Sequence, residues 1–242
     1  MPYLIVSDVH GNREALEAVV EDASGRYDGI LCLGDLVGYG ADPNYAVEWT
    51  RAHATVVIRG NHDRVCVGET SAEDYNSAAQ ASAQWTHGEL TPANAEYLRN
   101  LARGPLRIED FDLVHGSPAD EDEYLIDSGD VARLLGTLDA GVTFFGHTHV
   151  QGGFLIARRA VRRFLPGGID TLELDPDYYY LINPGSVGQP RDMDPRAAYA
   201  IYSPQDRTVE FHRVRYDIAR AAEKILQAGL PTVLAARLYE GA

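Results

Sequence analysis

The stretch VVIRGNHD (residues 56–63) joins a β-branched run to a polar cluster, and the rest of the chain repeats this arrangement. The run at 56–58 favours a β-strand that is covered on both faces, and the glycine after it permits a tight exit turn. The next side chains, Asn61, His62 and Asp63, offer an amide, an imidazole and a carboxylate. Such clusters also occur in ordinary polar turns. This one gains meaning because other apolar runs of the chain end in similar side chains.

The composition restricts the class of protein. The chain has 242 residues, 45% of them hydrophobic, and a net charge of -15. This charge argues against a broad surface for duplex nucleic acid and against docking on an anionic membrane. No apolar run approaches the roughly 20 residues of a membrane span. The two cysteines, Cys32 and Cys66, cannot form a disulfide framework, so we expect reduced thiols in a cytoplasmic protein.

Two earlier runs end in the same kind of chemistry. Residues 3–6 predict a strand that continues into Asp8 and His10, and residues 29–33 predict a second strand that ends at Asp35. Side chains alternate along an extended chain, so we expect Asp8 and His10 to point the same way. A helix-capping carboxylate beside a solvated histidine is the alternative for this pair.

Helices are predicted between these strands. Apolar side chains recur at helical spacing over residues 13–22, and the helix predicted over 43–53 begins with proline. Alternating strands and helices imply parallel pairing, with ligand sites at the carboxyl ends of the strands. Residues 72–101 predict two further helices, which we expect as a helical cap beside the site. No linker divides the chain, so we expect a single domain over residues 1–242.

Two later strands end in histidine. The run at 111–114 precedes His115, and the run at 142–145 precedes His147 and His149. A lone histidine is usually structural, but two of them two residues apart, in a chain with several such strand ends, indicate metal ligands. Further strand-like runs beyond His149 predict a second sheet.

The polar side chains at the strand ends combine oxygen and nitrogen donors without cysteine. This set suits Mn²⁺, Fe²⁺ or Zn²⁺ and disfavours a structural thiolate zinc site. It is too large for one ion, whereas two ions roughly 3.5 to 4 Å apart, sharing a carboxylate, would use it fully and are typical of phosphoryl hydrolysis. The set contains Asp8, His10, Asp35, Asn61, His62, His115, His147 and His149.

The order of these motifs resembles that of the calcineurin-like metallophosphoesterase superfamily. Asp-x-His, Gly-Asp, Gly-Asn-His-Asp, His-Gly and Gly-His-x-His occur intact and in this order between residues 8 and 149. The resemblance implies an α/β fold, a four-layer α-β-β-α sandwich of two mixed sheets. The small size of the chain looks more like the compact bacterial phosphodiesterases than the larger protein phosphatases or nucleases.

The resemblance also implies roles for single residues. His62 would protonate the leaving oxygen without binding metal, and Asp63 would hold its ring. Two divalent ions, with Mn²⁺ favoured over Fe²⁺, Zn²⁺ or Ni²⁺, would generate hydroxide near neutral pH. The implied ligands are Asp8, His10 and His149 for one ion, Asn61, His115 and His147 for the other, and Asp35 between them.

The substrate is the part that the sequence leaves most open. We expect a small phosphorylated molecule, nucleotide-like, with phosphodiesters favoured over monoesters. Arg13, Tyr39, Gln189 and Arg191 follow strand-end loops and are candidates for substrate contact, with solvated surface positions as the alternative. A serine/threonine protein phosphatase stays open as another function. So does a non-catalytic scaffold for protein interactions, the role of the retromer subunit with this fold, and the oligomeric state is open.

Overall fold

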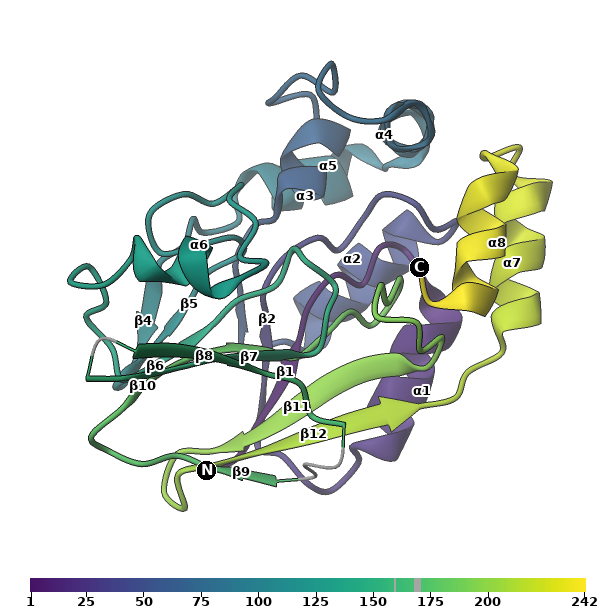
Figure 1. Cartoon of the computed structure of the whole chain (residues 1–242). Helices are drawn as coiled ribbons and strands as arrows, with labels where there is room; N and C mark the ends of the chain where they lie inside the picture. Colours follow the sequence, from purple (N-terminus) through teal and green to yellow (C-terminus); the bar gives the residue numbers. More distant parts are fainter. Residues whose placement is uncertain (159, 168–170) are drawn as a thin grey trace.

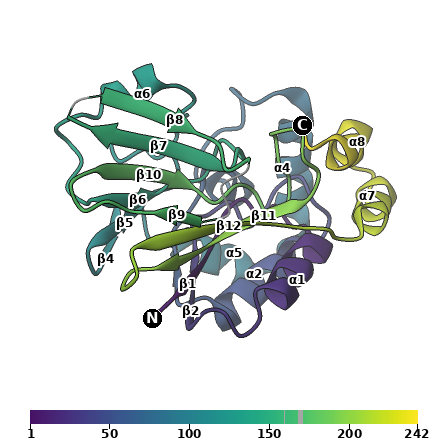
Figure 2. The same ribbon diagram turned by 60° about the horizontal axis from the view of Figure 1, so that its bottom comes forward.

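Two β-sheets pack face to face, and helices lie on their outer sides (Figure 1). The structure is a computed structural model and describes residues 1–158, 160–167 and 171–242. Each sheet has six strands and mixes parallel with antiparallel neighbours. The α-β-β-α sandwich predicted from the sequence is confirmed, as the turned view in Figure 2 also shows.

The first sheet begins with the parallel strands that the N-terminal repeats predict. These three strands pair in parallel, and the later strands of the sheet join them in antiparallel fashion. In spatial order the strands are β3 (Val56–Val57), β2 (Gly29–Cys32), β1 (Tyr3–Val6), β11 (Ala197–Ser203), β12 (Thr208–Val214) and β9 (Thr171–Glu173).

The second sheet places three parallel strands at its centre. β5, β6 and β10 run in parallel, so their carboxyl ends lie at the same edge. In spatial order the strands are β4 (Leu106–Ile108), β5 (Phe111–Leu113), β6 (Val142–Phe144), β10 (Tyr179–Asn183), β7 (Gly152–Ala157) and β8 (Ala160–Phe164).

Successive side chains of a strand enter different hydrophobic cores. In β1, Leu4 packs in the core beneath the helices, whereas Ile5 packs in the core between the two sheets. Phe111 and Phe144 of the second sheet meet Ile5 in that same inner core. This alternation follows from the two-residue period of a strand, and it explains why strands buried on both sides are apolar throughout.

The predicted helices of the N-terminal repeats are confirmed at their predicted bounds. Thr91 and Asp217 act as N-caps, since the side chain of each accepts a hydrogen bond from a backbone N–H of the first turn. None of the described helices is both long and apolar enough to cross a membrane. The helices are α1 (Arg13–Asp22), α2 (Pro43–His53), α3 (Asn61–Cys66), α4 (Ser77–Glu89), α5 (Pro92–Arg99), α6 (Ser128–Ala132), α7 (Ile218–Gln227) and α8 (Thr232–Glu240).

The segment from 56 to 63 differs from its prediction in two ways. Val56 and Val57 are only half-buried, because β3 is the edge strand of its sheet. Asn61 does not follow a turn but begins α3, so the amide and the imidazole of the polar cluster project from the first turn of a helix. Helix α8 and strand β9 are additional elements that the sequence did not predict.

Candidate metal centre and its cavity

Two groups of buried side chains meet where the strands of both sheets end. In each group the candidate ligand atoms all lie within 4.8 Å of one another. Asp35 belongs to both groups, so its carboxylate lies between them. The first group contains Asp8, His10, Asp35 and His149, and the second contains Asp35, His115 and His147.

The two histidines of the first group face each other with ring nitrogen atoms that carry no proton. The Nδ1 atom of His10 lies 2.9 Å from the carbonyl oxygen of Val37, and that of His149 lies 2.6 Å from the carbonyl oxygen of Gln189. A carbonyl can only accept, so both rings donate from Nδ1 and keep a lone pair on Nε2. The two Nε2 atoms lie 3.1 Å apart. A cation between them would turn this contact into ligation.

The second group is oriented in the same manner. His115 Nδ1 lies 2.8 Å from the carbonyl oxygen of Leu33, and its Nε2 lies 3.4 Å from Asp35 Oδ2. The Oδ1 atom of Asn61 lies 3.0 Å from the same Nε2, which adds an amide oxygen to the group. His147 donates from Nε2 to a backbone carbonyl 3.1 Å away, which leaves its Nδ1 free to accept.

The charges of the centre fit divalent ions. Asp8 Oδ1 and Asp35 Oδ2 are buried and have no hydrogen-bond partner among the described residues. A buried carboxylate oxygen without a partner is costly, and a bound cation removes that cost. Burial lowers the pKa of His147 to about 3, so this ring is neutral and can ligate. Burial opposes protonation of His115, but the neighbouring Asp35 raises its pKa to about 10. A metal ion bound beside His115 would replace this proton.

The backbone of five candidate ligands is left-handed. Strand β1 ends at Val6, and φ is 55° at Asp8 and 49° at His10. The prediction that these two side chains converge is met, but the expected extended backbone is wrong. Such angles cost on the order of 1–3 kcal/mol each, less for Asp and His than for bulky residues. The same region of φ is found at Asp35 (54°), His147 (65°) and His149 (59°).

Asp63 does not hold the ring of His62, and this prediction is corrected. Among the described residues, its carboxylate accepts backbone N–H groups from Asp35 at 2.8 Å, Leu36 at 2.9 Å and Gly60 at 2.9 Å. The reason is its place in the first turn of α3, where its carboxylate caps the N–H of Gly60 and also faces the free N–H groups of the loop after β2. Asp63 therefore braces the loop that carries Asp35.

Aromatic rings position His62 instead. Its ring centroid lies 4.4 Å from that of Tyr39, 5.1 Å from Tyr75 and 4.9 Å from His10, the last in an edge-on arrangement. The Nδ1 atom has no hydrogen-bond partner in the described chain, and burial lowers the pKa of the ring. His62 is thus held by packing, and not by a hydrogen bond to its Nδ1 atom from the described chain.

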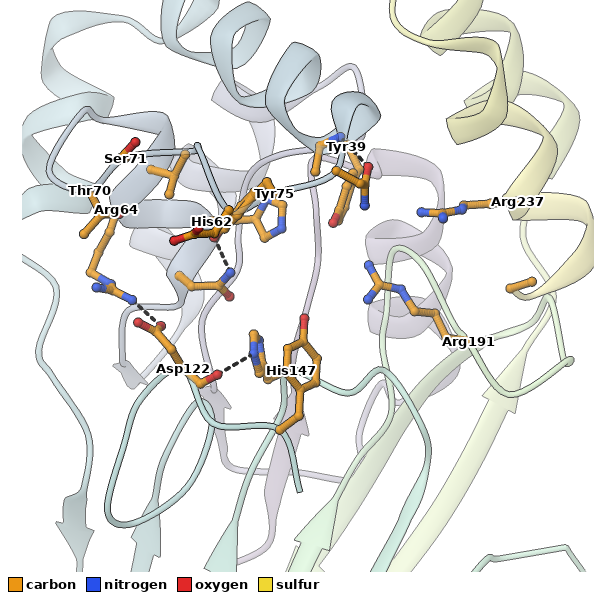
Figure 3. A pocket seen from close by; sticks show the side chains of 17 residues that line it. Tyr39, His62, Arg64, Thr70, Ser71, Tyr75, Asp122, His147, Arg191 and Arg237 are labelled. Atoms are coloured by element: carbon orange, nitrogen blue, oxygen red, sulfur yellow. Dashed lines mark hydrogen bonds and ion pairs between the residues drawn. The ribbon is translucent and has the colours of Figure 1, made fainter. Parts of the chain in front are cut away.

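A cavity of about 630 Å³ opens over the centre (Figure 3). Its volume lies within the range of about 300–1,000 Å³ that is usual for small-molecule sites. Aromatic and cationic side chains line it together, which suits an anionic organic ligand. The lining residues used below are Tyr39, His62, Tyr75, His147, Arg191 and Arg237.

The four candidate substrate contacts divide between the cavity and its surroundings. Tyr39 and Arg191 line the cavity. Gln189 is buried and accepts a hydrogen bond from Arg191 at 2.9 Å, so it supports that arginine. The expectation for Arg13 is corrected, because Arg13 lies outside the cavity lining and pairs with Glu17 at 2.9 Å on the exposed face of α1.

Several lining residues escaped the sequence reasoning. Tyr75 precedes α4, and Arg237 lies on α8, far along the chain from every strand-end motif. Neither stands in a motif or at a strand end. For Tyr75, the one available signal was the predicted helical cap over residues 72–101, which was placed beside the site without naming a residue that lines the cavity.

Tyr75 is expected to direct the amide of Asn61. Asn61 Nδ2 donates to the Tyr75 hydroxyl oxygen, which turns Oδ1 toward His115. Loss of such an outer partner typically costs about 10–100-fold in metal affinity. We therefore expect Tyr75→Phe to raise the dissociation constant for Mn²⁺ by this factor in a calorimetric titration. Tyr97→Phe, on α5, is the matched control, and equal affinities in both variants would contradict the role of Tyr75.

Gly60 leaves no room for a side chain beside Asp35. A Cβ atom at Gly60 would lie 2.1 Å from Asp35 Oδ1 and 2.5 Å from its backbone nitrogen. Overpacking of this kind costs about 1–3 kcal/mol. Gly60→Ala is therefore expected to lower the free energy of unfolding in urea by this amount and to weaken metal binding. Gly88→Ala, in α4 with nothing within 4 Å of the added atom, is the control and should leave both measurements intact.

Comparison with known proteins identifies relatives of the whole chain. A family model described as a calcineurin-like phosphoesterase superfamily domain matches residues 1–207. The crystal structure of a metallophosphoesterase from Sphaerobacter thermophilus is 40% identical, covers 100% of this chain and 99% of its own, and has a TM-score of 0.87. An uncharacterized protein of Methanocaldococcus jannaschii is 38% identical over 98% of this chain and 97% of its own. A hypothetical protein from Pyrococcus horikoshii shares the fold at 19% identity and a TM-score of 0.81, covering 100% of this chain and 98% of its own.

Proposed function

Since this chain belongs to the calcineurin-like phosphoesterase superfamily, we propose that it is a metal-dependent phosphoesterase that hydrolyses a small, nucleotide-like phosphoester, with phosphodiesters favoured. One observation carries the proposal. The buried carboxylate of Asp35 lies between two ligand groups and keeps an oxygen without a hydrogen-bond partner in the described chain. A shared carboxylate of this kind is typical of two-metal hydrolysis.

The chemistry of the two ligand groups supports the proposal of two ions. Two divalent ions, with Mn²⁺ favoured, would supply the Lewis acidity that activates water and offsets the charge of the phosphate. The backbone carbonyls that fix the histidine rings keep the ligand lone pairs aimed inward before any ion arrives. The proposed holders are Asp8, His10 and His149 for one ion, Asn61, His115 and His147 for the other, and Asp35 for both.

His62 is proposed to donate a ring proton to the leaving oxygen. It lines the cavity with His147, beside the candidate ligands. The Tyr39 and Tyr75 rings hold it, so little ordering is needed at the moment of reaction. Arg191 and Tyr39 are proposed to contact the substrate.

The preference for a nucleotide-like substrate is supported by the cavity. Tyr75 and Tyr124 line it and offer aromatic surface to a base. The local cation Arg191 also explains how an acidic protein of net charge -15 could bind an anion.

We also propose that residues 72–101 form a helical cap and that the protein is cytoplasmic. Asn76 and Ala79 at the start of α4 line the cavity, which supports α4 and α5 as a cap on a single domain. Cys32 and Cys66 are buried free thiols, which supports a cytoplasmic protein.

The test is an ester panel with the Mn²⁺-loaded protein. We expect faster turnover of bis-p-nitrophenyl phosphate than of p-nitrophenyl phosphate, and neither without metal. A preference for the monoester would replace the phosphodiesterase with a phosphatase. A preference for a phosphoserine peptide would favour a protein phosphatase. Absence of turnover in a protein that binds metal would favour a scaffold.

A further inference from the structure

We propose that Arg237 of α8 forms, with Arg191, a second anion-binding subsite in the cavity, which selects substrates that carry another phosphate or carboxylate group besides the scissile phosphoester. This inference rests on the proposed function and specifies the substrate of the same site. The binding group comes from the C-terminal hairpin of α7 and α8, which lies after the segment matched by the family model (residues 1–207).

The hairpin is fixed firmly enough to present a side chain. Leu234 and Leu238 of α8 are buried in a cluster that also contains Tyr39. Lys224 of α7 pairs with Glu14 at 2.5 Å and with Asp42 at 2.8 Å, which ties the hairpin to the helices of the first sheet. A group carried on rigid, anchored helices is well suited to recognition.

Arg237 and Arg191 lie on the same wall of the cavity. Figure 3 shows both guanidinium groups on the side of the cavity opposite Arg64 and Asp122. The Arg191 guanidinium carbon is 5.6 Å from the centre of the Tyr39 ring. Arg237 lies on α8, whose Leu234 and Leu238 pack in the same cluster as Tyr39, and all three of Tyr39, Arg191 and Arg237 line the cavity.

Neither arginine has a carboxylate partner among the described residues. The Arg237 guanidinium makes no hydrogen bond or ion pair within the described chain. The Arg191 guanidinium donates to the amide oxygen of Gln189 at 2.9 Å, and its Nε is buried without a partner in the described chain. On the opposite wall, by contrast, Arg64 is neutralised by Asp122. In a chain with 36 acidic and 21 basic residues, two guanidinium groups left unpaired on one wall indicate an anionic ligand.

The position of Arg237 indicates a group other than the scissile phosphate. The backbone N–H of Arg191 donates to the carbonyl oxygen of His149 at 3.1 Å, and the Tyr39 ring beside its guanidinium lies 4.7 Å from the ring of His10, so Arg191 stands between the centre and Arg237. Arg237 lies beyond Arg191 in Figure 3, on the far side from His147. A phosphoester at the centre would therefore leave Arg237 for a second anionic group farther along the same molecule.

The test measures binding without hydrolysis. The ligands are alkane bisphosphonates of graded chain length, the hydroxyalkyl phosphonates of the same lengths and the corresponding phosphonocarboxylates, titrated by calorimetry into Mn²⁺-loaded protein. Arg237→Gln is compared with wild type, with Arg237→Lys, and with Arg220→Gln. Arg220 is an exposed arginine of α7 that pairs with Glu223 at 2.8 Å, so this control removes the same charge from the hairpin outside the cavity.

The expected result is a loss confined to ligands with two anionic groups. Arg237→Gln should weaken the best bisphosphonate by about 10-fold or more, the range of a charge-assisted hydrogen bond, and leave the hydroxyalkyl phosphonates within about twofold. Arg237→Lys should retain part of the affinity, and Arg220→Gln should retain all of it. The ranking of bisphosphonates against phosphonocarboxylates identifies which second group is preferred. Equal losses for both ligand classes, or a loss no larger than that of Arg220→Gln, would overturn the subsite.

Binding and turnover separate this inference from the proposed function. Binding that depends on Arg237, in a protein that turns over no ester, would sustain the subsite and overturn the phosphoesterase. If esters are turned over but ligand affinity is the same with and without Arg237, the subsite alone is overturned. The Arg237 guanidinium has no partner to lose within the described chain, so the Gln variant should melt like wild type.

Discussion

Replacement of Asp35 by Asn is expected to reduce turnover of bis-p-nitrophenyl phosphate by more than the roughly 10²–10³-fold that the loss of one transition-state contact costs. Asp35 Oδ2 lies 3.6 Å from His10 Nε2 and 3.4 Å from His115 Nε2, so it faces both ligand groups. Its Oδ1 accepts the backbone N–H of His62 at 2.8 Å, which fixes the carboxylate in place. Asparagine would keep much of the shape but lose the charge that two cations would share.

The measurement is kcat/KM together with the number of Mn²⁺ ions bound per chain. Asp112→Asn is the control, because Asp112 is a buried carboxylate outside the centre whose partner is Arg107, at 2.5 Å. We expect Asp112→Asn to reduce stability while keeping turnover. An Asp35→Asn protein that binds two ions and keeps most of its activity would show that the carboxylate is not shared.

Replacement of His62 by Ala is expected to have the second largest effect, a loss of about 10²–10⁴ in kcat with substrates whose leaving group needs a proton. An alkoxide is a poor leaving group, so its departure depends on a donor. p-Nitrophenolate leaves readily as an anion, so kcat for p-nitrophenyl esters should fall less. Metal binding should persist, because His62 belongs to neither ligand group.

The check compares kcat for an alkyl ester and a p-nitrophenyl ester in the same variant. His87→Ala is the matched control, since His87 is an exposed histidine of α4 whose Nδ1 lies 2.8 Å from the backbone oxygen of Cys66. Equal losses with the two leaving groups would contradict proton donation and would point to a binding role for His62.

The convergence of the ligands could be predicted because it depends on a simple rule of topology. Parallel strands joined by helices bring their carboxyl ends to one edge. Asp8 follows β1, Asp35 follows β2 and His115 follows β5, so a reading of apolar runs and the residues after them located most of the centre. The two helices of the N-terminal repeats were equally accessible, because amphipathic spacing and a proline at the first turn are local signals.

The features that the sequence concealed depend on long-range packing or on backbone detail. No side-chain pattern in the sequence predicts the left-handed backbone conformation of Asp8 and His10. The family resemblance implied that Asp63 holds the ring of His62, whereas the free N–H groups around Asp63 decide where its carboxylate lies. Arg237 reaches the cavity only because α8 packs beside Tyr39, a contact between distant parts of the chain.

The most direct test of the two-metal account is a titration of metal-stripped protein with Mn²⁺, in which bound ions and turnover of bis-p-nitrophenyl phosphate are followed together. Activity is expected to rise only as the second ion of each chain binds, and Asp35→Asn is expected to show no such rise. Two ions bound without turnover of diester or monoester, with Fe²⁺, Zn²⁺ and Ni²⁺ giving the same result, would contradict it and favour a protein-interaction scaffold.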